Sequence, residues 1–526
     1  MGLNIRAEAE IASPAQRSPE SVSLEDTQGS REFFKISNPV LLLSALTIFL
    51  LLIEGGATHF PVLVVRVLLV VSVMVWTFGQ MKRQAMTLPR SNLFLVAVLF
   101  LGWAGLTLCW TPYQDVSVQS FMNLLMSLLL YGVVLQGIRS DRQVRQIVSV
   151  LIGMGLIEGL LGIVQYFFLD EARARGTFFN PNYFALYEVS ILTVALGLLS
   201  VSNTVQRQLW ESVLLWVTVG VTLAAFIVAQ SRGAFFGFVA AMVFLGLTRF
   251  GKIGVLALAL FIFIGAIVPN PMKQRFIDVA EQDPYAFTRF VMWKDAMGRV
   301  ADQPMGIGLG MYKYASFQYR FPIEHGIARY KKRAESAHNE YLQMAVEMGI
   351  GGLLIFLAGF VVWAKEVRCI LRGQLEPLKK GYAIGLSAAT IGLLVHSAVD
   401  SVFHEPALVA ILILCGGMVL ALRPQETSGG GAYFNLPFSY HPVRAGLVLF
   451  SGLILIALAV QPAAGWYAFD QGEKQAQVGQ VDLAAAWYQR AVRISPGTTV
   501  YHDALARASV QRFHLSGTPK LLVDAV

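Results

Sequence analysis

Long apolar runs separated by short polar segments dominate the pattern of this chain. Crossing a hydrocarbon core of about 30 Å takes about 20 residues of helix. Runs of about this length lie near 38–54, 62–80, 92–110, 116–138, 146–169, 183–201, 210–230, 233–248, 253–269, 340–364, 381–400, 405–422 and 443–465. Only 14% of the residues are charged and 55% are hydrophobic, whereas soluble domains carry about 25% charged residues. The pattern predicts an all-α, polytopic helical membrane protein with about 12–13 transmembrane helices.

Polar stretches divide the chain into five predicted parts. They are a disordered cytoplasmic tail (1–36), two parts of a transmembrane domain (37–269 and 340–465), a large loop (270–339) and a water-soluble tail (466–526). The first 36 residues are rich in Ser and Glu and lack the apolar core of a signal peptide. The three cysteines, Cys109, Cys369 and Cys415, are far apart and indicate neither a disulfide framework nor a thiolate metal site.

Lysines and arginines in the short connections predict the orientation. Alternate connections carry them, while intervening ones such as EGGATHF and WTPYQD contain none. The positive-inside rule therefore assigns the basic connections and the N-terminus to the cytoplasm. Basic residues on the opposite side are Arg173, Arg175, Arg232 and those of the large loop, where the run Lys331, Lys332 and Arg333 is expected to be solvated surface. A cation at a helix mouth is costly without a partner, and a lipid phosphate or pyrophosphate would supply one.

Two of these arginines stand beside helix starts. Arg175 opens the stretch RGTFFNPN, in which Asn180 and Asn182 could either cap the next helix or donate to a ligand. Arg232 follows Ser231, a good N-cap, so it is expected at a helix N-terminus that favours anions, with snorkelling to the interface as the alternative. Arg289 opens a short amphipathic helix and could point inward.

The stretch SAHNEYLQMAV sets His338, Asn339, Glu340 and Tyr341 at the mouth of an apolar helix. Because a free imidazole titrates near pH 6.5, His338 could act as a base that takes a proton from an acceptor hydroxyl, although a lone interfacial histidine more often bonds a carbonyl. Glu347 lies more than two turns further along and is expected to bond between helices. GIGLG (306–310) is expected to be a flexible turn, since no strand precedes it as in a nucleotide-binding loop.

Two further patterns allow more than one interpretation. His396, Asp400 and His404 recur at i, i+4 and i+8, which would suit a metal if they shared a face, but a polar wall of the same cavity is favoured. The tail residues Gly472, Gly479, Ala484, Tyr488, Ala491 and Pro496 match tetratricopeptide spacing. Because one repeat and part of another cannot bury a solenoid core, the tail is expected to pack on the membrane domain or on a partner.

The order RGTFFNPNYFALY, SRGAFFG, RF..W..A....ADQPMGIGLGMY and SAHNEYLQMAVEMGIGGLLIFL resembles the O-antigen ligase and polymerase superfamily over roughly residues 90–420. The resemblance implies a GT-C-like glycosyltransferase of the bacterial inner membrane whose active site faces the periplasm. It also implies a donor glycan on undecaprenyl pyrophosphate, with neither a nucleotide sugar nor a metal. It implies that Arg175, Arg232 and Arg289 hold the pyrophosphate, with Arg299 and Arg320 as rivals of Arg289. His338 would activate the acceptor, and Asn180, Asn182, Asn339, Glu340 and Tyr341 are candidate substrate-binding residues.

Several functions stay open at this point. Ligases of the superfamily move O-antigen onto lipid A-core, polymerases join repeat units on the carrier, and a third branch glycosylates protein hydroxyls. The extra tail departs from the minimal ligase pattern and leaves the acceptor undecided. A lipid-glycan transporter would need mid-span charges and two similar halves, which the sequence does not show. An assembly scaffold that uses the tail as an adaptor is the third class.

Overall fold

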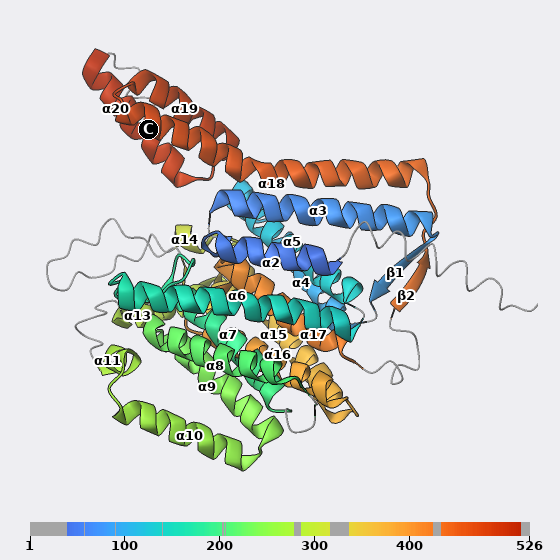
Figure 1. Cartoon of the computed structure of the whole chain (residues 1–526). Helices are drawn as coiled ribbons and strands as arrows, with labels where there is room; N and C mark the ends of the chain where they lie inside the picture. Colours follow the sequence, from blue (N-terminus) through green and yellow to red (C-terminus); the bar gives the residue numbers. More distant parts are fainter. Residues whose placement is uncertain are drawn as a thin grey trace, which may run out of the picture. The chain divides into compact units, whose positions relative to one another are not determined.

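The structure is a computed structural model of the whole chain, and it describes residues 39–56, 58–89, 91–138, 140–201, 205, 207–277, 286–315, 336–423 and 433–516. The predicted tail 1–36, Arg320 and the run from 331 to 333 lie outside these ranges. The longer helices are α2 (Pro39–Leu52), α3 (His59–Lys82), α4 (Asn92–Thr107), α5 (Gln114–Gly137), α6 (Asp141–Phe168), α7 (Pro181–Leu199), α8 (Leu209–Ala229), α9 (Arg232–Arg249), α10 (Lys252–Ile267), α13 (Ala286–Asp302), α15 (Glu340–Arg372), α16 (Pro377–His396), α17 (Pro406–Ala421), α18 (Pro442–Gln477), α19 (Val481–Ile494) and α20 (Thr499–Ser516) (Figure 1). The short elements are α11 (Pro271–Ile277), α14 (Tyr312–Ala315), β1 (Ala85–Pro89) and β2 (Tyr433–Pro437).

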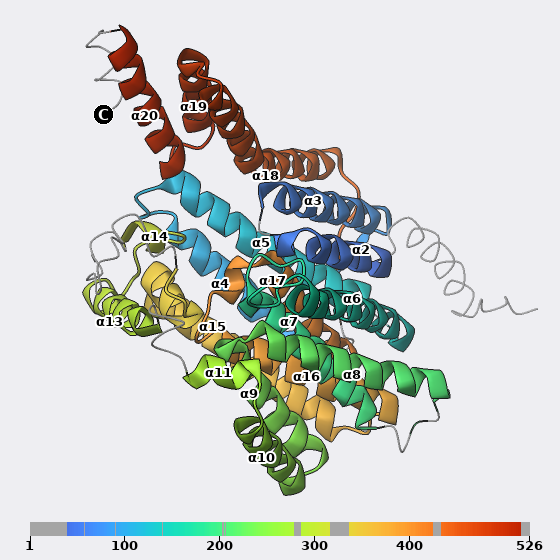
Figure 2. The same ribbon diagram turned by 60° about the vertical axis from the view of Figure 1, so that its left-hand side comes forward.

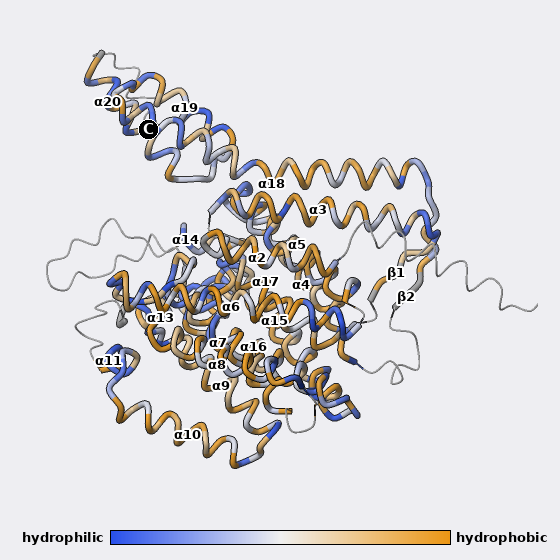
Figure 3. The backbone as a smooth tube through the Cα atoms, in the orientation of Figure 1, coloured by the Kyte–Doolittle hydropathy of each residue, from blue (hydrophilic) through white to orange (hydrophobic). Residues whose placement is uncertain are grey.

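Each of the thirteen predicted apolar runs falls on an apolar helix. In the part of the chain that the structure describes, nine helices are long and apolar enough to cross a membrane, and there are ten if α10 and α11, which are bent by 76°, form one span. The helices α2, α4 and α17 are apolar but shorter, and they account for the remaining predicted runs. Apolar residues follow these helices along most of their length in Figure 3. The predicted fold class is confirmed: the chain is a multi-pass helical membrane protein.

The basic connections meet at one end of the helix bundle. Lys379, at the start of α16, lies 3.0 Å from Asp141 at the start of α6. Arg249, at the end of α9, donates to the carbonyl of Ser200, 2.7 Å away, just after α7. The strands β1 and β2, which the sequence pattern did not predict, join two further connections as an antiparallel pair. We call the opposite end, where the remaining connections meet, the site end.

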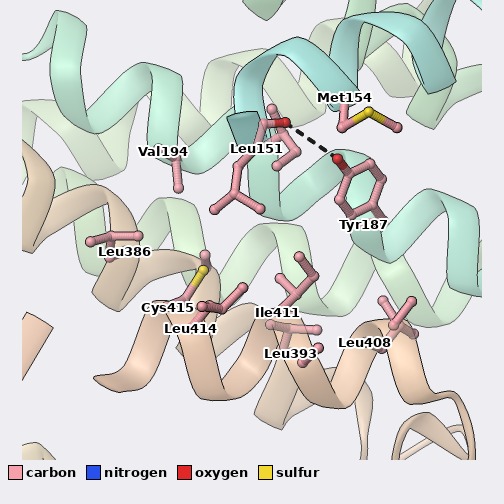
Figure 4. Packing of buried hydrophobic residues seen from close by; sticks show 14 of the residues in the cluster. Leu151, Met154, Tyr187, Val194, Leu386, Leu393, Leu408, Ile411, Leu414 and Cys415 are labelled. Carbon is pink, nitrogen blue, oxygen red and sulfur yellow. Dashed lines mark hydrogen bonds between the residues drawn. The ribbon is translucent and has the colours of Figure 1, made fainter. Parts of the chain in front are cut away.

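The helices α7 and α16 form the centre of the bundle. Both are buried along most of their length, and they approach closely where each carries glycine: a Cβ on Gly197 would lie 2.4 Å from the Cα of Gly385. Small residues at such crossings let two helix backbones pack directly, which is a main source of stability between membrane helices. Figure 4 shows the apolar packing around them, including the bond from the Tyr187 hydroxyl to the Leu151 carbonyl, 3.3 Å.

The helix α15 is broken at Gly349, which has φ +72°. The rings of Tyr341 and Phe356 are 6.0 Å apart, although 15 residues of unbroken helix would separate them by about 22 Å. The first part of α15 therefore folds back against the second. The sequence pattern assigned 340–364 to a span and did not predict this break, at which Gly349 adopts a backbone conformation that other residues rarely reach.

The tail is a helical extension of the last span. α18 runs 36 residues without interruption through the predicted boundary at 465, beside α3 in both Figures 1 and 2. Phe469 of α18 packs on the rings of Tyr488 and Tyr501, 5.8 and 5.3 Å away, in the small core formed with α19 and α20. The turn between α19 and α20 contacts the membrane domain, since Gly497 donates to Asp115, 2.6 Å away. The assignment of these helices as a tetratricopeptide repeat stays a prediction.

Candidate active site

Four segments that are far apart in the sequence converge on the carboxylate of Asp400 at the site end. This side chain is 2% exposed. Its Oδ1 accepts a hydrogen bond from Ser401 N (2.9 Å) and pairs with His338 Nδ1 at 3.0 Å, while its Oδ2 accepts from Asn182 Nδ2 at 2.8 Å. Arg289 Nη2 lies 3.9 Å from Oδ2, and Nη1 donates to the Val399 carbonyl. The Asp400 carboxylate is thus the shared partner of His338, Asn182 and Arg289, which the sequence singled out separately.

The surroundings of Asp400 keep it charged. Burial by itself would raise the pKa of this carboxyl, but the hydrogen bond with His338 and the nearby His396 and Arg289 outweigh burial and hold the pKa well below its usual range. His396 is fully buried, with Nε2 3.7 Å from Asp400 Oδ2, and neither ring nitrogen has a hydrogen-bond partner in the part of the chain described. Asp400 is therefore an anion at neutral pH that faces two imidazoles and a guanidinium.

His338 is held in a strained backbone conformation. Its φ is +47°, which costs a non-glycine residue about 1 kcal/mol or more. Neighbouring bonds maintain it, since Trp293 Nε1 donates to the Ala337 carbonyl (3.0 Å) and Ala337 N donates to Gln343 Oε1 (3.1 Å). Strain of this kind often marks functional positions. Its side chain is 40% exposed, and a neutral imidazole that donates Nδ1–H to Asp400 carries its lone pair on Nε2.

Arg173, rather than Arg175, joins the Asp400 network. Arg173 Nη2 donates to Asn182 Oδ1 (2.8 Å), which turns the amide nitrogen of Asn182 toward Asp400. Its Nε donates to the carbonyl of Ala229 at the end of α8. Arg175 lies 3.5 Å from Glu171, and both side chains are nearly half-exposed. The sequence analysis noted both arginines on the uncommon side and gave the site role to Arg175, whereas Arg173 is the one that reaches Asn182.

Arg232 is the first residue of α9 and is half-buried. The expected N-cap is present, because Ser231 Oγ accepts from Ala234 N at 3.2 Å. A Cβ on Gly233 would lie 2.9 Å from Cε1 of His396. The N-terminus of α9 therefore packs directly behind the pair of His396 and Asp400.

The other candidate substrate-binding side chains have partners within the protein. Asn180 and Asn339 are the N-caps of α7 and α15, and the Tyr341 hydroxyl donates to the Leu394 carbonyl at 2.7 Å. Glu340 is 5% exposed and accepts from Phe403 N at 2.7 Å. These contacts shape the loops around His338, and a direct role in substrate binding stays a prediction for all four.

The spacing of His396, Asp400 and His404 does not produce a shared helix face. α16 ends at His396, so Asp400 lies in the following turn, and His404 Nδ1 lies 3.3 Å from Glu340 instead. Among the described residues, no group of three or more His, Cys, Asp or Glu side chains could hold a metal ion. His396 and Asp400 still lie close together, with Nε2 3.7 Å from Oδ2, and a polar wall formed with His404 stays a prediction.

Glu347 and the GIGLG loop bind each other. The Glu347 carboxylate accepts from the backbone N–H groups of Gly310 (2.8 Å) and Tyr312 (3.1 Å), so it holds this loop. Tyr312 is the first residue of α14, so one of these bonds joins two helices, as the sequence analysis expected. At Gly306, a Cβ would lie 2.4 Å from the nitrogen of Gly349. The glycine-rich loop thus docks onto the break in α15, which turns the His338 end of this helix back toward Asp400.

Fold and site together define a multi-pass membrane protein with a polar, partly exposed His–Asp pair at one end of its helix bundle. Residues 213–357 match the family model described as O-antigen ligase, and this stretch includes Arg232, Arg289 and His338. The chain is 22% identical over 321 residues to a Rickettsia conorii (strain ATCC VR-613 / Malish 7) protein named "Putative polysaccharide ligase RC0486", covering 57% of this chain and 74% of that protein. It is also 22% identical over 345 residues to a "Putative polysaccharide ligase" of Rickettsia bellii (strain RML369-C), covering 62% and 80%. The chain is thus distantly similar to proteins that carry the name polysaccharide ligase.

Proposed function

We propose that this protein is an inverting, metal-independent glycosyltransferase of the bacterial inner membrane. It transfers a glycan from undecaprenyl pyrophosphate to an acceptor hydroxyl at the periplasmic face, in the manner of an O-antigen ligase that uses lipid A-core as acceptor. The observation that carries the proposal is the 3.0 Å contact between His338 and Asp400 at the site end, within reach of Arg289. The match of residues 213–357 to the O-antigen ligase model supports the same reaction class.

In the proposed reaction His338 acts as the base, and arginines stabilise the leaving pyrophosphate. The acceptor oxygen forms a bond to the anomeric carbon as His338 Nε2 takes its proton, and Asp400 stabilises the resulting imidazolium. The bond between the anomeric carbon and the pyrophosphate oxygen breaks, and its electron pair leaves with the pyrophosphate. Arg232 and Arg289 stabilise this growing negative charge, with Arg175 on the exposed rim as a further candidate. Attack from the face opposite the leaving group inverts the anomeric configuration.

Transfer by the purified protein tests the proposal. Protein in lipid nanodiscs is incubated with undecaprenyl-pyrophosphate glycan and lipid A-core, and the linkage in the product is determined. General-base catalysis contributes about 10²–10⁴-fold, so His338→Ala should lose at least about 100-fold. Arg232→Ala should be similarly impaired, and both should insert normally. The matched control is His514→Ala, an exposed histidine of α20, which should keep full activity.

Different outcomes separate the candidate functions. Full transfer by His338→Ala would contradict the proposed mechanism. Movement of the donor across a bilayer without a new glycosidic bond would favour the transporter. Lipid-linked repeat units offered in place of lipid A-core distinguish a polymerase, which lengthens the glycan on its carrier, from a ligase, which leaves single repeats unjoined.

A further inference from the structure

The turn between α19 and α20, residues 495–498, is bound on both sides of one glycine. Gly497 N donates to Asp115 Oδ2 at 2.6 Å, and the Gly497 carbonyl accepts from the Tyr314 hydroxyl at 2.5 Å. Asp115 belongs to the first turn of α5 and Tyr314 belongs to α14. Both helices lie below the tail in Figure 2. This turn, which we call the tail turn, is therefore tied to two separate elements of the site end.

Gly497 fits closely against the start of α5. A Cβ at this position would lie 2.4 Å from Asp115 Oδ1 and 2.7 Å from Val116 Cγ2. On the other side, burial and the nearby Asp115 carboxylate raise the pKa of Tyr314 to about 12, so its hydroxyl keeps the proton that it donates. Its ring also packs on Tyr113, with 4.7 Å between the ring centres. The tail turn is thus held in one position at neutral pH.

A chain of polar side chains fixes the same turn from the membrane side. Gln461 Nε2 of α18 donates to the carbonyl of Ile494, the residue before the turn, at 2.7 Å. Gln119 Nε2 donates to Gln461 Oε1 at 3.1 Å, and Gln119 Oε1 accepts from Arg66 Nη1 at 2.8 Å. Arg66 is 4% exposed within α3. The apolar core of the tail is separate from that of the membrane domain, so polar contacts of this kind set the place of the tail turn.

The helix α14 connects the tail turn to the backbone beside His338. Its first residue, Tyr312, is 5% exposed and belongs to the same small core as Ala337, which directly precedes His338. Tyr312 N also donates to Glu347 in the folded-back part of α15. Tyr312 and Tyr314 are two residues apart in a helix of four residues. A displacement of Tyr314 by the tail turn therefore reaches the core around Ala337 through one short helix.

We propose that the tail turn positions the base His338 through α14, an inference that rests on the proposed function. Gly497 fixes Tyr314, and Tyr312 in turn supports the backbone at Ala337. His338 depends on this support because its φ of +47° is strained for a residue other than glycine. A misplacement of about 1 Å in a reacting group can cost about 100-fold in rate. Gly497 and Tyr314 are thus positioning residues that act on transfer through His338.

Two full-length variants test the proposal in the nanodisc assay with the lipid-linked donor and the acceptor. Tyr314→Phe removes only the hydroxyl that bonds the tail turn, and Gly497→Ala forces a Cβ against Asp115. We expect kcat to fall about three- to tenfold in Tyr314→Phe and at least about tenfold in Gly497→Ala. KM for the donor and for the acceptor should stay within about twofold, because a displaced base affects the chemical step. The matched control is Tyr467→Phe, an exposed tyrosine of α18 in the tail, which should keep full activity.

Amide hydrogen exchange follows the displacement without any substrate. Ala337 N and Tyr312 N each donate to a side chain of α15 at 3.1 Å, so both amides are protected while α14 is in place. Both should exchange at least about fivefold faster in Tyr314→Phe and at the wild-type rate in the control variant. This measurement needs only Tyr314→Phe, so it also covers the case in which Gly497→Ala does not fold.

The outcomes separate the positioning role from simple stabilisation and from the proposed function. An unchanged kcat in folded Tyr314→Phe, a raised KM alone, or wild-type exchange at Ala337 would each overturn the positioning role. A loss of transfer that matches a loss of folded protein would also overturn it, since the tail would then only stabilise the fold. Wild-type protein that transfers no glycan would instead overturn the proposed function, and exchange at Ala337 would still decide whether the tail turn acts on the backbone beside His338.

Discussion

Replacing Asp400 with asparagine tests whether its carboxylate holds the base. Both oxygens accept hydrogen bonds: Oδ1 from His338 and Ser401, and Oδ2 from Asn182. Asparagine has one acceptor oxygen, so its amide nitrogen must face either Asn182 or the other two donors. The variant also removes the negative charge that faces Arg289 and stabilises an imidazolium at His338.

The geometry sets the expected size of the effect. A hydrogen bond to a charged group contributes about 1.5–3 kcal/mol, and at least one such bond is lost whichever way the asparagine turns. Each 1.36 kcal/mol is a factor of ten in rate, so we expect kcat/KM to fall by roughly 10- to 150-fold. The volume of the side chain hardly changes, so the protein should remain folded and inserted.

The assay is glycan transfer in nanodiscs, with thermal unfolding followed in parallel. Asn182→Asp combined with Asp400→Asn exchanges donor and acceptor, because the new amide can donate to the new carboxylate. This double variant should recover at least about fivefold relative to Asp400→Asn alone, as coupled residues do. A single variant with activity within twofold of the wild type would refute the argument that Asp400 positions and charges the base.

Three other substitutions test the arrangement around this centre. Arg173→Gln should lower glycan transfer at least about tenfold, and more than Arg175→Gln does, because only Arg173 orients Asn182. A larger loss of transfer in Arg175→Gln would contradict this prediction. Gly349→Ala should lower the free energy of unfolding by about 2 kcal/mol or more, since φ is +72° and a Cβ would meet Pro304 O and Met305 C at 2.5 Å. Its control is Gly298→Ala in α13, where a Cβ meets no atom within 4 Å. Equal melting temperatures for the two variants would contradict the prediction. Burial raises the pKa of the Glu405 carboxyl from 4.5 to about 8, so the folded state favours its neutral form. Its contribution to stability is full below about pH 4.5 and is lost as the pH rises to about 8. Glu405→Gln should flatten this decline in melting temperature between about pH 5 and pH 8, and an unchanged slope would count against it.

The apolar pattern predicted the fold class because lipid imposes a simple rule on the chain. Every crossing must satisfy its own backbone hydrogen bonds, so runs such as 381–400 and 443–465 become helices whatever their neighbours do. The apolar pattern did not predict the break in α15 at Gly349. Gly349 is one of many glycines in the sequence, and the loop that makes its conformation favourable, 304–310, is distant along the chain.

The candidate site was predictable in part for a related reason. His338, Arg289 and Asn182 stood out as polar residues at helix mouths, where an unpaired polar group is costly. Asp400 was grouped with His396 and His404, because the pattern assumed that the helix continued past 396. The choice between Arg173 and Arg175 depended on which side chain reaches Ala229 and Asn182, and no local signal contains that information.

The sequence alone thus determined what each segment needs: apolar runs must lie in lipid, and cations or an imidazole at their ends need partners. Only the tertiary structure decided which partners meet. Hydrophobic periodicity depends on residues within a few turns of each other, whereas the contact of Asn182 and His338 with Asp400 joins residues separated by 218 and 62 positions. Such contacts depend on how the helices pack, and packing is a property of all of them together.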